Sequence, residues 1–486
     1  MKKILVAALM VVLAAPAFAA VQNVKVSGDI TASYVDRNDF NLGMTSVGAL
    51  GNADDTGLKS QSMFLTQTRL RVDADLTDNV STAVGLINER VWNAENNSDA
   101  NTNYANDTNV QLYLATVTLR EFLYSPLTVT VGRQAFIYGN GLVLGNGPAS
   151  QGSGPLQYVA QDLNLRAAND GVKVVLDYKP LTIDLIYFKS QQSVQSIRGL
   201  AGLRSGQSSS VYGYNLNYQL NDAWNTVVEQ YLFSSIIGKG CLNNCDSIGI
   251  AGENKGNKLY VPGLRASTNP IKGLNIQGEL AFQAGDQNVK QNNKVAAEPV
   301  RAMAAQVMAS YSLPILTKYK PTLNMSYTYL SGDKRQYENY SASGDKDAKH
   351  FTAWSPLEGS IGSGTIYGTL YPMSNLNILS GGASVSPLED VTASFTWSNL
   401  WAADSYNTNN PLLIFQPNEG TGVLNPATKT TGERGLGNEY DVNVKYNYTE
   451  DVSFGVTVGW YVPGDALSNL NRDTASQAIA DVAVKF

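Results

Sequence analysis

The stretch GNEYDVNVKYNYTEDVSFGVTVGWYV, residues 437–462, alternates apolar and polar side chains on both sides of a short polar break. Alternation with a period of two is typical of a β-strand whose two faces meet different surroundings. One face carries Tyr440, Val442, Val444, Tyr446 and Tyr448, and after the break Val452, Phe454, Val456, Val458, Trp460 and Val462. The other face carries Glu439, Asp441, Asn443, Lys445 and Asn447, and then Ser453, Gly455, Thr457, Gly459 and Tyr461. The stretch predicts two strands joined by a tight turn.

The same alternation recurs along the chain in eighteen segments of about 9 to 14 residues, a length at which a tilted strand crosses a membrane. The 26 Tyr, the 43 Gly and a mean hydropathy of −0.17 fit such strands better than apolar helices. The predicted strands cover residues 24–36, 62–76, 80–92, 108–120, 127–136, 170–179, 181–190, 211–221, 225–236, 258–268, 274–285, 299–312, 320–332, 376–386, 390–402, 437–449, 452–462 and 475–486.

The connections between these segments alternate between short and long. Short ones, such as Thr77-Asp78-Asn79 and Lys179-Pro180-Leu181, have the composition of tight turns. The long ones run about 37–61, 93–107, 137–169, 191–210, 237–257, 286–298, 333–375, 403–436 and 463–474. In membrane barrels short turns face the periplasm and long loops face outside, and eighteen strands with periplasmic termini require nine long loops, as found.

An open sheet edge in hydrocarbon would leave backbone groups unpaired at several kcal/mol each, so a membrane-spanning sheet must close. The predicted fold class is therefore all-β: a closed transmembrane antiparallel up-and-down β-barrel of about 18 strands. We find no linker or shift in composition, so residues 20–486 are predicted to form a single barrel domain.

The N-terminus has the pattern of a secretory signal peptide. Lys2 and Lys3 precede an apolar run that is too short to span as a helix, and Ala17-Phe18-Ala19 ends it as a cleavage site. We expect cleavage after Ala19, so that residues 1–19 are removed and the barrel is integral to a bacterial outer membrane, with lipid as its first partner.

Loss of the two leader lysines leaves 33 basic against 41 acidic residues, a net charge of about −8, which makes nucleic acid an unsuitable partner. Export to an oxidising compartment favours a local disulfide between Cys241 and Cys245. Two cysteines without nearby histidines do not form a zinc site, and we expect no cofactor.

The last predicted strand ends in ADVAVKF, with Val482, Val484 and Phe486 on one face. A terminal aromatic residue in an alternating strand resembles the C-terminal assembly signal of outer-membrane proteins. The resemblance implies that Phe486 is recognised by the barrel-assembly machinery.

Strand parity assigns the polar faces to a wet lumen and the apolar faces to lipid. The predicted lumen charges are Arg69, Arg71, Asp73, Asp75, Lys173, Asp177, Lys179, Asp184, Glu279, Glu439, Asp441 and Lys445. Five basic and seven acidic side chains make a mixed lining that suits neutral or zwitterionic solutes, or weakly selective diffusion. Alternatively, these charges only pair across strands and keep the wall wet.

The charge of Arg133 does not suit the face that strict alternation gives it, because that face, shared with Val129 and Val131, meets lipid, where arginine at midplane costs about 2–4 kcal/mol. A bulge at Gly132 would turn it inward, and a place at the membrane edge would let it snorkel. We favour an inward, pore-lining Arg133 at the mouth of the 137–169 loop, which is long enough to fold back and narrow the pore. The 333–375 loop, which carries the only histidine, His350, is a second candidate lid or a solvated loop.

Two stretches carry a resemblance to a known family. They are VGRQAFIYGNG, residues 131–141, and the segments GLGNEYD at 435–441 and GWYVPGD at 459–465. They resemble the Gly-Arg-Gln strand, the Glu-x-Asp strand and the Pro-Gly-Asp turn of the alginate-export family of outer-membrane porins, which implies an 18-stranded barrel. Ala135 and Leu142 stand where that family commonly has an acidic residue and an arginine, and an alginate carrier would be expected to present a cationic lumen.

The sequence favours an outer-membrane channel for hydrophilic solutes, with saccharides or oligosaccharides among them. One rival is a barrel that serves as a scaffold or sheath for an electron-transfer or adhesion partner, although the chain has no Cys-x-x-Cys-His for haem of its own. An enzyme is a weaker rival, because one histidine without a serine elbow gives nucleophilic catalysis little to use.

Overall fold

The computed structural model describes most of the chain. It covers residues 23–40, 42, 60–92, 110–145, 163–165, 168–190, 209–237, 257–291, 294–332, 350–355, 357, 364–371, 373–404, 433–467 and 472–486. The predicted signal peptide, residues 1–19, and the predicted Cys241–Cys245 disulfide lie outside these residues. None of the helices in the described part has the length and apolar character needed to span a membrane.

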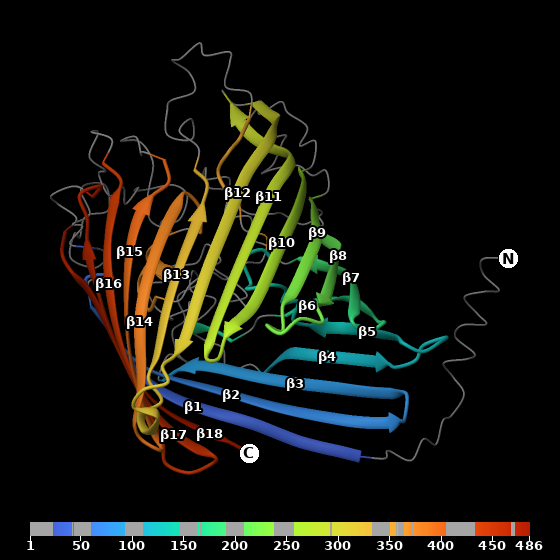
Figure 1. Ribbon diagram of the computed structural model, residues 1–486, viewed down its shortest axis with the longest axis horizontal. Coiled ribbons are helices and arrows are strands. Elements are labelled where there is room, and N and C mark those ends of the chain that lie inside the picture. The colour runs from blue at the N-terminus through green and yellow to red at the C-terminus, as the bar shows by residue number, and fades with distance from the viewer. Residues whose placement is uncertain are drawn as a thin grey trace.

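All eighteen predicted strands are present, in the predicted order, in one sheet (Figure 1). They are β1 Asn23–Asn38, β2 Ser60–Thr77, β3 Val80–Val91, β4 Gln111–Leu119, β5 Leu127–Gln134, β6 Asn169–Asp177, β7 Leu181–Ser190, β8 Ser209–Gln219, β9 Val227–Ile237, β10 Asn257–Ile271, β11 Leu274–Gln291, β12 Lys294–Ser312, β13 Thr322–Leu330, β14 Leu376–Leu388, β15 Val391–Ala402, β16 Gly435–Asn447, β17 Val452–Pro463 and β18 Ala475–Lys485. The short helices η2, Thr317–Tyr319, and α2, Tyr367–Leu370, complete the described elements.

Each strand pairs antiparallel with its neighbours in sequence, and β1 pairs with β18, so the sheet closes on itself. At this seam the backbone of Phe486 exchanges two hydrogen bonds with Gly28, at 2.8 and 3.0 Å. The Phe486 ring lies over Gly28, because a Cβ at position 28 would be 2.6 Å from the ring. A closed ladder leaves no strand edge facing lipid, which confirms the predicted 18-stranded barrel.

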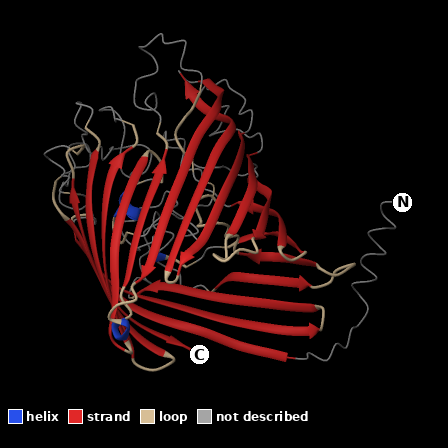
Figure 2. Cartoon of the chain, viewed as in Figure 1, coloured by secondary structure: helices blue, strands red, loops and turns tan. Residues whose placement is uncertain are grey.

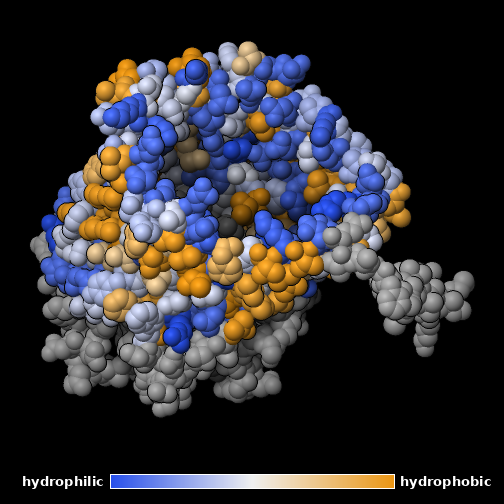
Figure 3. All heavy atoms as spheres, turned by 90° about the horizontal axis from the view of Figure 1, so that it is seen from below, coloured by the Kyte–Doolittle hydropathy of each residue, from blue (hydrophilic) through white to orange (hydrophobic). Residues whose placement is uncertain are grey.

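The alternation in the sequence becomes a difference between the two faces of the wall. On β17, Phe454, Val456 and Trp460 are 41–48% exposed, whereas Tyr461 is fully buried. From below, the space-filling surface shows a hollow edged by hydrophilic residues, with hydrophobic residues on the outer wall around it (Figure 3). Apolar side chains therefore face outward, where lipid would cover them, and the polar side chains that alternate with them face inward.

One predicted loop is instead an extension of a hairpin. The β11–β12 pairing continues to Gln291↔Lys294, so the connection predicted at 286–298 is mostly strand. Its sequence, DQNVKQNNKVAAE, is rich in polar residues because these strands extend beyond the apolar band, and polarity alone suggested a loop.

The lumen is filled toward its outer end, which is the end opposite both termini. Segments that follow the strands contribute the buried residues Phe40, Leu42, Phe136, Tyr138, Leu142, Val143, Leu144, Phe351, Trp354, Ile366, Tyr367, Leu370, Tyr371 and Leu467. They pack against inward rings of the wall: Phe136 stacks on Phe188 with centroids 4.5 Å apart, and Tyr138 contacts Phe233 at 5.4 Å. The helix α2 lies within the ring of strands (Figure 2). The prediction of a wet lumen is therefore wrong for this end.

Candidate solute path

Two stretches of chain fold into the lumen and bind its wall on different sides. Residues 136–144, the first inward segment, follow β5 and cross to β9–β11. Residues 364–371, the second inward segment, include α2 and lie against β16–β18. Because β10 and β18 lie on opposite arcs of an eighteen-stranded ring, the two segments narrow the lumen from two sides.

The first inward segment is held at its tip by charged side chains of the wall. The Arg265 guanidinium forms an ion pair with Glu229 through Nη1, donates to Gln277 Oε1 at 2.8 Å, and donates to Asn140 Oδ1 at 2.8 Å. The Asn140 backbone N–H donates in turn to Glu279 Oε2 at 2.7 Å. Glu229 and Glu279 are 6% and 4% exposed, so these bonds lie in a place from which water is excluded. Glu229, Arg265, Gln277 and Glu279 of the wall, together with Asn140 of the segment, are called the first dock.

Two further contacts fix the approach of the segment. Gly139 adopts a φ of +60°, and a Cβ there would lie 2.6 Å from Glu279 Oε2, so only glycine allows this close approach. Tyr138 donates its hydroxyl to Asp184 at 3.0 Å, and Lys173 lies 3.0 Å from the same carboxylate. Burial, together with the Asp184 charge, raises the pKa of Tyr138 above its usual range, so its phenol remains a neutral donor.

The second inward segment is held by two carboxylates of β16. The Ile366 and Tyr367 backbone N–H groups donate to the two oxygens of Glu439, at 3.0 and 2.6 Å, and Glu439 is fully buried. The Thr365 hydroxyl donates to Asp441 Oδ1 at 2.5 Å. Glu439 thereby satisfies two N–H groups at the start of α2 that have no partner within the helix, and Asp441 binds the Thr365 side chain. This group is called the second dock.

Neighbouring strands complete the second dock. The Gln477 amide of β18 donates to the Thr365 carbonyl at 3.0 Å and accepts a hydrogen bond from Arg37 Nε at 2.5 Å. The Tyr371 and Tyr461 hydroxyls lie 2.5 Å apart, and Tyr461 also donates to a backbone carbonyl of β16. The second segment is therefore tied to β16, β17, β18 and, through Arg37, to β1.

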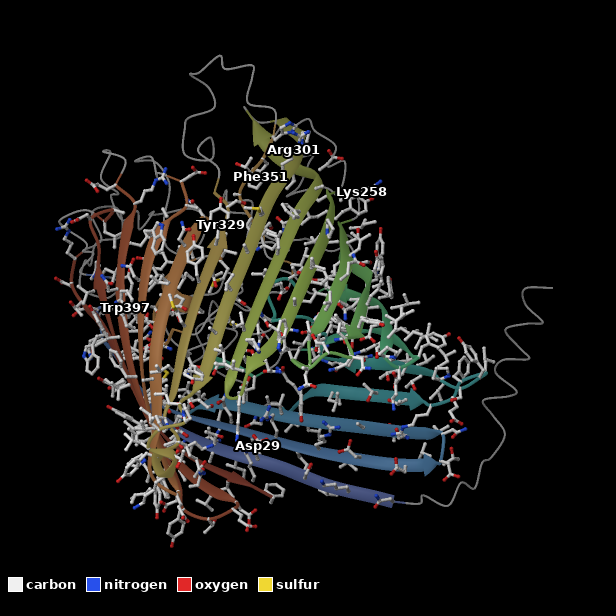
Figure 4. All side chains as sticks on the ribbon, viewed as in Figure 1. Asp29, Lys258, Arg301, Tyr329, Phe351 and Trp397 are labelled. Atoms are coloured by element: carbon white, nitrogen blue, oxygen red, sulfur yellow. The ribbon has the colours of Figure 1, made fainter. Side chains whose placement is uncertain are left out.

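A third stretch, residues 350–355, lines the outer end of β11–β13. Phe351 forms backbone hydrogen bonds with Pro299 and Arg301, at 2.7 and 2.8 Å, and Figure 4 shows Phe351 beside Arg301 at the outer end of the wall. Gln283 of β11 exchanges two hydrogen bonds with the Ser355 backbone. The single histidine, His350, begins this stretch.

The wall of β1 and β2 keeps water-exposed charges. Asp29 of β1, labelled in Figure 4, forms an ion pair with Arg69 of β2 at 3.0 Å, and Arg71 pairs with Asp73 at 2.8 Å. The arginine side chains are 35% and 48% exposed, against 14% for Arg265 in the first dock. The open part of the lumen therefore lies along β1 and β2, toward the end with the termini.

The strand register puts eleven of the thirteen predicted residues on the inward face. They are Arg69, Arg71, Asp73, Asp75, Lys173, Asp177, Asp184, Glu279, Glu439, Asp441 and Lys445. The structure brings Glu439 and Asp441 together in the second dock and Lys173 and Asp184 together beside Tyr138. Sequence reasoning missed Asp29, Glu229 and Arg265, which the same parity rule applied to β1, β9 and β10 would have found.

The inward placement favoured for Arg133 is wrong. Pairing of β4 with β5 runs without a shift through Ala115↔Arg133 and Val117↔Val131, so there is no bulge to turn the side chain. Gly132 has a φ of +127°, and a Cβ at this position would lie 1.9 Å from the Ala115 carbonyl oxygen, so the backbone conformation is open only to glycine. Arg133 thus stays on the outward face at the end of β5, where it pairs with Asp170 at 3.3 Å.

Lys179 is also not part of the lumen wall. β6 ends at Asp177, and Lys179 lies exposed in the turn before Leu181 with a φ of +22°. Alternation was extended two residues too far, because the Lys-Pro turn has no polar run to mark where the strand ends.

A family model described as "Alginate export" matches residues 206–481, which is more than half of the chain and includes Arg265, Glu279 and Glu439 of the two docks. The chain belongs to the alginate export family. No curated protein matches it. Membership and the closed 18-stranded barrel together make this family member an outer-membrane porin-type β-barrel.

Solved structures of three Pseudomonas aeruginosa proteins, among them the outer-membrane protein OpdK, share the fold of this family member. OpdK superposes with a TM-score of 0.52 at 9% identity, covering 96% of this chain and 99% of that one. OccK2 (OpdF), in complex with glucuronate, gives 0.50 at 10% identity with coverage of 96% and 99%. OprD gives 0.50 at 11% identity, with 96% of both chains covered. At these identities the likeness shows a shared fold and nothing more.

Proposed function

We propose that this barrel is an outer-membrane channel for small hydrophilic solutes, and that uncharged saccharides pass it more readily than polyanionic ones. The observation that carries the proposal is that four of the five lumen cations described above are paired. Arg69, Arg71, Lys173 and Arg265 each form an ion pair with a carboxylate. A polyuronate needs a wall of uncompensated positive charge, whereas a neutral sugar needs hydrogen-bonding groups.

The proposal includes export and assembly of the chain. Residues 1–19 would be cleaved as a signal peptide, and Phe486 would be recognised by the assembly machinery before it reaches its place over Gly28. Both steps are consistent with a barrel whose termini lie at one end and whose last residue closes the seam.

A sheath for a partner protein is less well supported. A sheath needs a lumen wide enough for another chain, but Tyr138, Trp354 and Tyr367 of this chain occupy the outer end and are at most 6% exposed. A narrowed lumen is suited to small solutes.

Conductance in planar bilayers and swelling of proteoliposomes test the proposal. We expect a stable open conductance, and faster swelling in uncharged oligosaccharides than in uronate oligomers of the same length. Free glucuronate is a useful third solute, because it carries the charge without the chain length. A silent barrel would contradict the channel, and equal or faster entry of uronate oligomers would contradict the preference for neutral sugars.

A further inference from the structure

Two turns at the end of the barrel with the termini each carry a leucine in the left-handed backbone region. Residues 120–126, between β4 and β5, and residues 313–321, between β12 and β13, read REFLYSP and LPILTKYKP. The turns at 77–79, 388–390 and 448–451 are shorter and acidic. These two turns are called the apolar turns; the β8–β9 turn, residues 220–226, is as long as the first and exposes Trp224, but it carries Asp222 and no cation.

Each apolar turn exposes large side chains to its surroundings. Leu123 is 85% exposed and Tyr124 49%, while Ile315 is 60% and Leu316 67% exposed. Leu123 and Leu316 both stand in the left-handed region, with φ of +71° and +50°, where a large side chain is uncommon. A soluble surface would favour glycine or asparagine at such positions, so the leucines indicate contact with something apolar.

Cations accompany the apolar tips. Lys318 and Lys320 flank Tyr319 in the second turn, with the Lys318 ammonium 5.7 Å from the Tyr319 ring, and Arg120 begins the first turn. In residues 313–321 the sequence has no acidic residue. Apolar tip, aromatic ring and lysines in one short turn match the order of acyl chain, glycerol region and phosphate in a lipid leaflet.

The position of the apolar turns along the wall also fits contact with a lipid leaflet. The helix η2 of the second turn contacts β14 and lies at the lower end of the wall in Figure 2. Tyr124 of the first turn reaches Tyr178 of the β6–β7 turn, with hydroxyls 3.2 Å apart, so it too follows the wall. The turns belong to strand pairs eight strands apart, on different sides of the ring (Figure 1).

We propose that the two apolar turns anchor the barrel in the phospholipid of the periplasmic leaflet, with Leu123 and Leu316 in the acyl region and Lys318 and Lys320 at anionic headgroups. Two anchors on different sides fix the depth and tilt of the barrel in the bilayer. The anchor is independent of what the lumen carries.

Spin labels measure the depth directly. With Cys241 and Cys245 replaced by serine, nitroxides are attached at Leu123→Cys and Leu316→Cys, and, as matched control, at Asp222→Cys in the β8–β9 turn. The barrels are placed in vesicles of phosphatidylethanolamine and phosphatidylglycerol, and heat-dependent gel mobility verifies folding. We expect both leucine positions to be more accessible to oxygen than to a nickel chelate, and the control to show the reverse.

The lysines are tested by lipid selectivity. Spin-labelled phosphatidylglycerol should associate with the wild-type barrel more strongly than phosphatidylcholine, and Lys318→Gln/Lys320→Gln should reduce that ratio several-fold, because each cation near an anionic leaflet favours association by about fivefold. The same double change at Lys25 and Lys445, which lie on the inward face of β1 and β16 and not toward lipid, is the control. Nickel-accessible labels at both tips would overturn the anchor and would indicate a docking site for a water-soluble partner or a second copy.

Discussion

The first inward segment is bound by a dock in which positive and negative charges alternate, whereas the second is bound by two carboxylates that receive mainly backbone donors. In the first dock Arg265 lies between Glu229 and Asn140, and Glu279 accepts from the segment itself. In the second, Glu439 accepts two backbone N–H groups. The first dock therefore depends on a cation that balances the charge of buried carboxylates. The second dock depends on carboxylate oxygens that accept hydrogen bonds from the backbone. Variants of the two docks should respond differently.

The largest effect is expected for Arg265→Met. It leaves Glu229 and Glu279 buried without their cation, and loss of one partner from a buried pair costs about 3–5 kcal/mol. We expect a fall of that size in the free energy of unfolding, measured by urea denaturation in vesicles, and a larger channel conductance. Arg265→Met/Glu229→Gln should recover part of the stability, because the buried charge is removed as well. Equal loss in the single and double variants would show that charge balance does not hold the first dock.

Glu439→Ala should have the next largest effect. It leaves the Ile366 and Tyr367 N–H groups without acceptors, at about 1–3 kcal/mol each, but also removes the cost of burying the carboxylate itself, so we expect a net loss of about 2–4 kcal/mol. Conductance should rise as the second inward segment leaves the wall. Asn443→Ala, on the same face of β16 but exposed, is the control and should change neither quantity. A wild-type conductance in Glu439→Ala would mean that the second segment does not narrow the path.

Asn140→Ala should act on the first dock alone and more weakly. It removes the acceptor of Arg265 Nε but keeps the backbone bond to Glu279, so a loss of about 1–2 kcal/mol is expected. Combined with Glu439→Ala, its effect on stability should be additive, because the docks share no residue. Strong non-additivity would show that the two segments support each other through the apolar cluster between them.

The smallest effect is expected for Tyr138→Phe, at about 1 kcal/mol for one hydrogen bond. Because the pKa of Tyr138 is raised in the folded state, its contribution is fully present below the unfolded pKa of about 10 and is lost as the pH rises through the folded value. The melting temperature of the wild type should therefore fall more steeply above pH 10 than that of Tyr138→Phe. Parallel pH profiles would contradict the assignment.

The wall was predictable from the sequence, and the 137–169 and 333–375 loops were its candidates for narrowing the lumen, but which of their residues fold inward and how the wall holds them was not predictable. Strands such as β16 and β17 have two faces in different surroundings, so the period of two is written into their residues, and pairing then follows from chain order. The inward segments carry no period. A signal did exist in residues 136–144, FIYGNGLVL, because an apolar run of this kind is costly in a solvated loop. The prediction for Lys179 failed because a turn ends the strand before it, and the prediction for Arg133 failed because strict alternation holds through Gly132 without the bulge that would have turned the side chain inward.

The size of polymer that enters the lumen tests most directly whether docked segments of the chain itself narrow this barrel. Single-channel conductance is measured in uncharged polyethylene glycols of graded size, for the wild type and for Asn140→Ala/Glu439→Ala. The account predicts that only small polymers lower the wild-type conductance and that larger ones do so in the variant. The same size limit in both proteins would contradict it.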